Sequence, residues 1–135
     1  MKNQIDYQTN EYKSTANSLS SIIIPLPYNS ILKGVTVRKE TLKSFGNLAA
    51  IQCRVSLIQD SSNSNIRLDH ELLNGTLYSS EDGSNNLVYE KTLSGIYDFP
   101  IQKEGIALKV NIYNYTNNSN LIRVNYIVKN LEGGI

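Results

Sequence analysis

Cysteine, histidine and tryptophan are almost missing from this chain of 135 residues, which holds one Cys, one His and no Trp. A single cysteine, Cys53, cannot form an intramolecular disulfide, and it excludes zinc and iron–sulfur sites that need several thiolates. A single histidine, His70, excludes metal sites built from two or three imidazoles. The scarcity of these residue types therefore argues against a metalloenzyme, and we expect no cofactor.

The sequence also lacks the motifs that carry catalysis or bind phosphate. It contains no Gly-x-Ser-x-Gly nucleophile elbow and no glycine-rich dinucleotide or Walker loop. His70 stands between Asp69 and Glu71, which would share one face of a strand and could serve a hydrolase or a cation, but we favour the interpretation that they form a solvated charged segment on an outer strand. Cys53 lies in an apolar run, where burial makes a thiol a poor nucleophile. We predict that the protein is not an enzyme.

One segment, Glu81–Asn86, gathers oxygen ligands around a glycine turn, as calcium-binding loops do. It does not follow the twelve-residue EF-hand spacing and lacks the closing bidentate glutamate. Ordinary turn chemistry accounts for every residue in it. Calcium binding at this loop stays an open alternative.

Long apolar runs and dense basic runs are absent too. The N-terminus is polar, so we expect neither a secretion signal nor a membrane span. The net charge is +1, and the basic residues Lys33, Arg38, Lys39 and Lys43 are not interleaved with aromatic residues. This pattern argues against nucleic-acid binding.

What the sequence does contain is period-two alternation of apolar and polar residues, which is typical of β-strands. The clearest runs cover 49–58, 106–113 and 122–129, and we predict that the last two form a hairpin around the Asn-rich segment 116–120. Shorter strands are predicted at 20–24, 31–39, 66–73, 76–80, 87–93 and 96–99, with Ile31, Val35 and Val37 on one face and a bulge at Gly34. The dipeptides Asn74-Gly75, Asp82-Gly83 and Ser94-Gly95 are predicted turns.

Eight to ten short strands in this length indicate an all-β antiparallel sandwich, and we predict a jelly roll, with an immunoglobulin-like sandwich as the alternative. A short helix is expected around 40–45. Residues 1–18 are polar and predict an N-terminal arm, which packs either on its own sheet or on a neighbouring copy, and residues 19–135 form the single sandwich domain.

The predicted hairpin is apolar on both faces, and such strands are usually covered on both. Its outward apolar residues form a predicted assembly interface of Ile127, Leu121, Tyr113 and Tyr115. Tyrosine and asparagine are also the residues of sugar-binding surfaces. The predicted recognition tip therefore adds Asn117, Asn118 and Asn120, and the alternative function is a carbohydrate- or receptor-binding module.

The polar arm, the missing catalytic set and the closing hairpin from Ile106 to Leu131 give the chain a resemblance to known proteins. It resembles the small single jelly-roll virion proteins that form the pentameric vertices of tailless icosahedral bacteriophages. This resemblance covers the whole chain but carries no sequence motif, so no functional residue is transferred. It implies a homo-oligomer, a pentamer at a capsid vertex, that contacts a major capsid protein and belongs to a virion assembled in the host cytoplasm.

Overall fold

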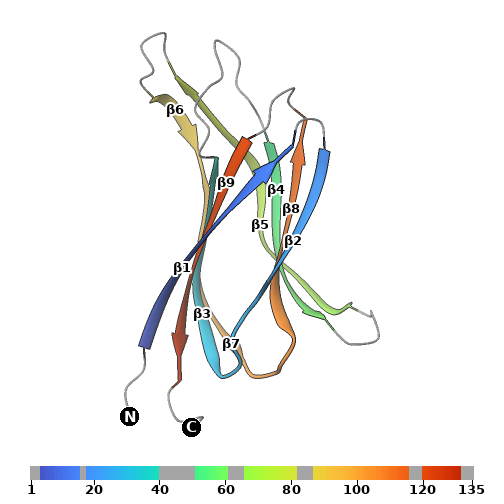
Figure 1. Cartoon of the computed structure of the whole chain (residues 1–135). Helices are drawn as coiled ribbons and strands as arrows, with labels where there is room; N and C mark the ends of the chain where they lie inside the picture. The colour runs from blue at the N-terminus through green and yellow to red at the C-terminus, as the bar shows by residue number, and fades with distance from the viewer. Residues whose placement is uncertain are drawn as a thin grey trace.

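A computed structural model describes residues 4–15, 18–39, 51–60, 66–81, 87–115 and 120–131. The described residues form antiparallel strands and short connections (Figure 1). Their bounds are β1 (Gln4–Ser14), β2 (Ser18–Pro25), β3 (Ser30–Lys39), β4 (Ile51–Asp60), β5 (Ile66–Glu81), β6 (Leu87–Lys91), β7 (Leu93–Ile101), β8 (Ile106–Asn114) and β9 (Asn120–Asn130). The predicted helix around 40–45, the loop at 82–86 and the segment 116–119 lie outside the described residues.

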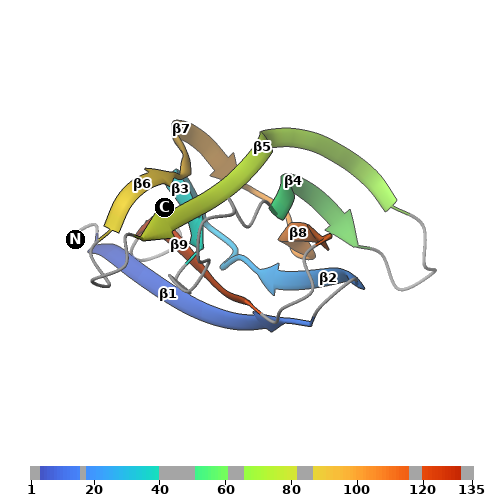
Figure 2. The same ribbon diagram turned by 90° about the horizontal axis from the view of Figure 1, so that it is seen from above.

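Two sheets face each other in a sandwich (Figure 2). One is four-stranded, in the order β1-β9-β3-β7, and the other is five-stranded, in the order β2-β8-β4-β5-β6. The order β1-β9-β3-β7 is that of the BIDG sheet of a jelly roll. The order β2-β8-β4-β5 is that of its CHEF sheet. The predicted jelly roll is confirmed, and the immunoglobulin-like alternative is wrong.

The fifth strand is an addition to that plan. β5 has 16 residues, and its last part, from Tyr78 to Glu81, pairs with β6. The remaining length of β5 pairs with β4. β6 therefore widens one edge of the five-stranded sheet without changing the order of the other strands.

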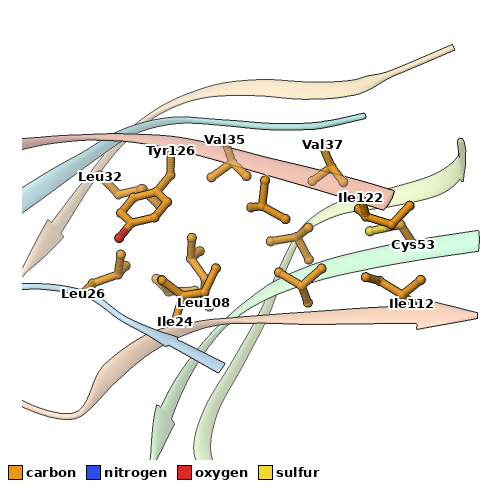
Figure 3. Packing of buried hydrophobic residues seen from close by; sticks show 14 of the residues in the cluster. Ile24, Leu26, Leu32, Val35, Val37, Cys53, Leu108, Ile112, Ile122 and Tyr126 are labelled. Carbon is orange, nitrogen blue, oxygen red and sulfur yellow. The ribbon is translucent and has the colours of Figure 1, made fainter. Parts of the chain in front are cut away.

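The core lies between the sheets and is filled by alternate side chains from each (Figure 3). In each of β4, β8 and β9 one alternating set of apolar side chains is buried, as the period-two pattern of these runs predicts. Burying apolar surface is the main stabilising term in such a sandwich. The buried residues of these strands include Ile51, Cys53, Val55, Leu57, Ile106, Leu108, Val110, Ile112, Ile122, Val124, Tyr126 and Val128.

β3 shows how a bulge changes which side chains face the core. Its register against both neighbours shifts between Leu32 and Gly34, which confirms the predicted bulge. The shift exchanges the two faces, so Leu32 is buried before the bulge and Val35 and Val37 after it. Ile31 is only partly buried and does not share their face, contrary to the prediction.

The predicted hairpin of the last two strands is wrong. β8 pairs with β2 and β4, whereas β9 pairs with β1 and β3, so the two strands belong to opposite sheets. In a jelly roll the final connection crosses from one sheet to the other. A short polar segment between two alternating runs is compatible with either arrangement, which is why local pattern did not separate them.

Two predicted turns are also wrong. Asn74-Gly75 lies inside β5, opposite Arg54 and Cys53, and Ser94-Gly95 lies inside β7, opposite Thr36 and Val35. Turn dipeptides are local preferences, and pairing with a neighbouring strand overrides them here. The segments 66–73 and 76–80 are therefore parts of one long strand.

The predicted polar arm is an edge strand of the chain's own sandwich. β1 pairs with β9 over its whole length, from Gln4 opposite Asn130 to Ser14 opposite Asn120 (Figure 1). Tyr12 packs against the core from this strand. Of the two placements left open by the sequence, the structure has the arm on its own subunit.

Candidate interaction surfaces

The two carboxylates beside His70 converge on one arginine. Arg54 of β4 donates from Nε to Glu71 Oε1 at 2.8 Å and from Nη2 to Asp69 Oδ1 at 3.1 Å. The hydrogen bond that Arg54 donates to Glu71 is the largest cause that raises the pKa of Arg54 above its ordinary value. The hydrogen bond to Asp69 is the next largest. The carboxylates are thus engaged in an exposed ion pair, and the described residues hold no group of three or more metal-ligating side chains.

His70 itself faces the other way. Its ring lies 6.0 Å from the ring of Phe99, which belongs to β7 in the opposite sheet and packs against the core. The predicted separation of the imidazole from the two carboxylates is therefore seen in the structure. His70, Asp69 and Glu71 do not converge on a common site.

Cys53 is a core residue. Its side chain is buried, and burial raises the pKa of its thiol to about 12. A thiol that stays protonated at neutral pH and is closed off from solvent makes a poor nucleophile. The sequence interpretation of Cys53 as a small buried hydrophobe agrees with this placement.

The four residues of the predicted assembly interface are divided between the two sheets. Ile127 and Leu121 lie on β9, with their side chains on the outer face of the four-stranded sheet, whereas Tyr113 and Tyr115 belong to β8 and the residue after it. They do not form one patch. Of the predicted tip, Asn120 begins β9 opposite Ser14, and Asn117 and Asn118 lie outside the described residues.

Ile127 belongs to an apolar hollow on the outer face of the four-stranded sheet. The hollow measures about 430 Å³, and its floor and walls come from β3, β7 and β9. In register, Gly34 of β3 stands between Ile127 of β9 and Ile96 of β7. Because glycine has no side chain, the row is depressed at its middle, with an isoleucine on each side.

Ile96 is the residue of this surface that sequence reasoning missed. It is 94% exposed, the highest value among the large exposed hydrophobic residues of the described chain. A signal was present, because Tyr97 and Phe99 alternate with it, and two aromatic residues on the core side leave Ile96 pointing outward. Lys33, which lines the hollow, forms an ion pair with Asp98.

A second surface lies on the outer face of the five-stranded sheet. The rings of Tyr113 and Tyr115 stack with centroids 6.4 Å apart and planes 18° from parallel. Together with Leu19, which is 64% exposed, they line a shallow pocket of about 230 Å³. Ser21 donates a hydrogen bond to Asn111 next to this pocket. The surface combines apolar rings with polar neighbours.

Neither a protein-family model nor a curated protein matches this chain. Among solved structures it is similar to a chain of infectious bursal disease virus strain Gx, with a TM-score of 0.48 and 8% identity over 98% of this chain and 33% of that one. It is also similar to the Clostridium thermocellum xylanase 10B CBM22-1–GH10 modules complexed with xylohexaose, with a TM-score of 0.44 and 10% identity. This second match covers 92% of this chain and 26% of the other.

The chain thus spans about a third of the length of the viral chain and about a quarter of the xylanase chain. Within the described residues, no helix is long and apolar enough to cross a membrane.

Proposed function

We propose that the protein is a non-enzymatic structural protein that self-assembles through the outer face of its four-stranded sheet. The observation that carries the proposal is the apolar hollow beside Ile127, bordered by the almost fully exposed Ile96. An isoleucine that is almost fully exposed beside a hollow with an apolar lining offers surface that a partner can remove from water. A second copy of the chain carries the same surface and can cover it.

Three placements support the non-enzymatic part of the proposal. Arg54 engages both Asp69 and Glu71, His70 packs beside Phe99, and Cys53 is buried with a raised thiol pKa. Each residue that sequence analysis weighed for catalysis thus has a structural role in the sandwich. None of them is left facing a shared cleft with another.

We further propose that the assembly is a virion, with this protein at a capsid vertex. Jelly rolls are a common architecture of viral capsid domains, although the fold also serves lectins and enzymes. The sequence resemblance predicts a pentamer that contacts a major capsid protein, and both remain predictions. Fold and resemblance support this finer assignment, and the oligomer number tests it.

The test compares two neighbouring residues of β9 that face opposite ways. Ile127→Asp places a charge in the outer hollow, and we expect native mass spectrometry to show weaker self-association while circular dichroism shows a folded monomer. Tyr126→Ala empties a core position that is 8% exposed in the wild type, and we expect a loss of about 3–5 kcal/mol of folding stability.

Gln52→Asp, on the exposed face of the other sheet, is the matched control for added charge and should assemble normally. A wild-type chain that stays monomeric across the micromolar range would contradict self-assembly. Normal assembly of Ile127→Asp would place the interface elsewhere.

A second candidate function is carbohydrate binding at the surface of Tyr113, Tyr115 and Leu19. Aromatic faces beside amides and hydroxyls suit sugar rings, and the parallel tyrosines with Asn111 and Ser21 supply that combination. Glycan-array binding that is lost in Tyr115→Ala and retained in Tyr28→Ala would favour it. Tyr28 is the matched control because it is also an exposed tyrosine but does not line this pocket. A blank array would count against it.

A further inference from the structure

We propose that two copies of this chain associate about a two-fold axis, with Ile96 of each copy inserted into the hollow over Gly34 of the other. This inference rests on the proposed self-assembly and names its geometry. It does not depend on a virion, and because a two-fold contact joins copies in pairs, a pentamer would need a different contact surface.

Ile96 has the geometry of a protruding knob. β7 is an edge strand of the four-stranded sheet, and Ile96 points outward between the polar residues Ser94 and Asp98. Ile96 is 94% exposed, so almost none of its apolar surface is buried within its own subunit. Burial of such a side chain on a partner removes that surface from water.

Gly34 supplies the matching hole. A Cβ built at Gly34 would lie in van der Waals contact with Gly95 O at 3.4 Å and Ile127 Cδ1 at 3.8 Å, so a larger side chain at this position would take up space in the hollow that Gly34 lines. The hollow of about 430 Å³ is larger than the cavity of roughly 150 Å³ that admits a benzene ring. An isoleucine side chain therefore fits into it.

A second copy is the occupant because knob and hole lie in one cross-strand row. Ile96 is the register partner of Gly34, and Gly34 is the partner of Ile127. A two-fold axis that runs along the strands between β3 and β7 places each knob over the hole of the other copy. Contacts in which the same patch serves both subunits are the rule for two-fold dimers.

Charge along the same axis is complementary. Lys33 of β3 and Asp98 of β7 form an ion pair within one copy, next to the hollow. Because the axis exchanges the β3 and β7 sides at the same height along the strands, Asp98 of one copy faces Lys33 of the other. Each charge then has an opposite charge both within and across the dimer.

The position of the axis sets the size of the contact. With the axis between β3 and β7, these two strands of each copy overlap, and two strands about 4.8 Å apart and about ten residues long present roughly 300 Å² in projection. Stable dimers bury about 800 Å² of accessible surface per partner, so we expect a weak dimer whose population depends on concentration. Aligned packing of two sheets face to face is an established arrangement.

The experiment removes the knob and fills the hole in separate full-length chains. Sedimentation equilibrium measures self-association of Ile96→Ala and of Gly34→Val, and we expect each to weaken it at least tenfold. An equimolar mixture should recover association, because the knob of the Gly34→Val chain enters the open hollow of the Ile96→Ala chain. On the other side of that heterodimer, the filled hollow of the Gly34→Val chain faces the alanine of the Ile96→Ala chain, so no isoleucine has to enter it.

Leu19→Ala, which truncates an exposed apolar residue of the opposite sheet, is the matched control and should leave association unchanged. If Gly34→Val does not fold, as judged by its thermal melt, Gly34→Ala replaces it. Wild-type association that neither variant weakens, or a mixture that does not recover, overturns the knob-and-hole contact while self-assembly stands. A monomeric wild-type chain overturns both.

Discussion

At the scale of single residues, the buried Cys53 makes the folding stability of the sandwich depend on pH in the alkaline range. Burial raises its thiol pKa from an ordinary 9.0 to about 12, so between these values the unfolded chain releases a proton that the folded chain keeps. Folding stability from this group is complete below about pH 9 and declines above it.

We expect the free energy of unfolding to fall by about 1.4 kcal/mol per pH unit above about pH 9 because of this cysteine. Urea denaturation of the wild type and of Cys53→Ala over that range measures the effect. Tyr12, Tyr97 and Tyr126, whose pKa values are raised mainly by burial, add a decline common to both chains. Parallel stability curves for the two chains would show that the thiol does not titrate in this way.

Gly95 leaves no room for a side chain unless the ring of Tyr97 moves. A Cβ there would stand 2.6 Å from Cζ of Tyr97, whose hydroxyl donates to Leu72 O at 2.9 Å and so connects β7 with β5. We expect Gly95→Ala to destabilise the fold by about 1–3 kcal/mol, because the tyrosine ring must move. Chemical denaturation measures this loss.

Gly34→Ala is the control, since its Cβ meets nothing closer than 3.4 Å. We expect it to be nearly neutral or slightly stabilising, because alanine restricts the unfolded chain. Equal losses in Gly34→Ala and Gly95→Ala would mean that strand glycines matter here for a reason other than Tyr97.

At the scale of elements, β1 decides whether the polar N-terminus belongs to the fold. All of its 11 residues pair with β9. Deletion of residues 1–14 would turn β9, a central strand, into an edge and uncover core residues such as Tyr126. We expect loss of cooperative thermal unfolding by circular dichroism, since a domain has only about 5–15 kcal/mol of net stability to lose.

Glu11→Ala serves as the control for this deletion, because it removes only the exposed ion pair with Arg123 and should cost less than about 1 kcal/mol. A truncated chain that melts like the wild type would show that the segment is an arm rather than a structural strand.

Elements were predictable where alternation was strict, as in β4, β8 and β9, because period two separates the two faces of a strand without knowledge of its neighbours. The prediction failed where pairing overrode a local signal, as at Asn74-Gly75 inside β5. It also failed at Ile31, because a bulge at Gly34 exchanges the faces of β3.

At the scale of the whole molecule, the first and last strands are neighbours, since Gln4 lies opposite Asn130. Folding must close nearly the entire chain before this pair forms, and sandwiches dominated by distant contacts fold in about milliseconds to seconds. We expect stopped-flow refolding in that range or slower. Folding within microseconds would contradict this strand order as the determinant of the folding rate.

The sequence by itself determined the fold class, the inward residues of the clearest strands and the outward position of Ile127. These follow from composition and alternation, which are local. Only the tertiary structure decided the sheet partners of β8 and β9, the place of β1, and the row that joins Ile127, Gly34 and Ile96. That row comes from three strands far apart in sequence, because hydrogen-bond register, and not spacing along the chain, sets which residues meet across a sheet.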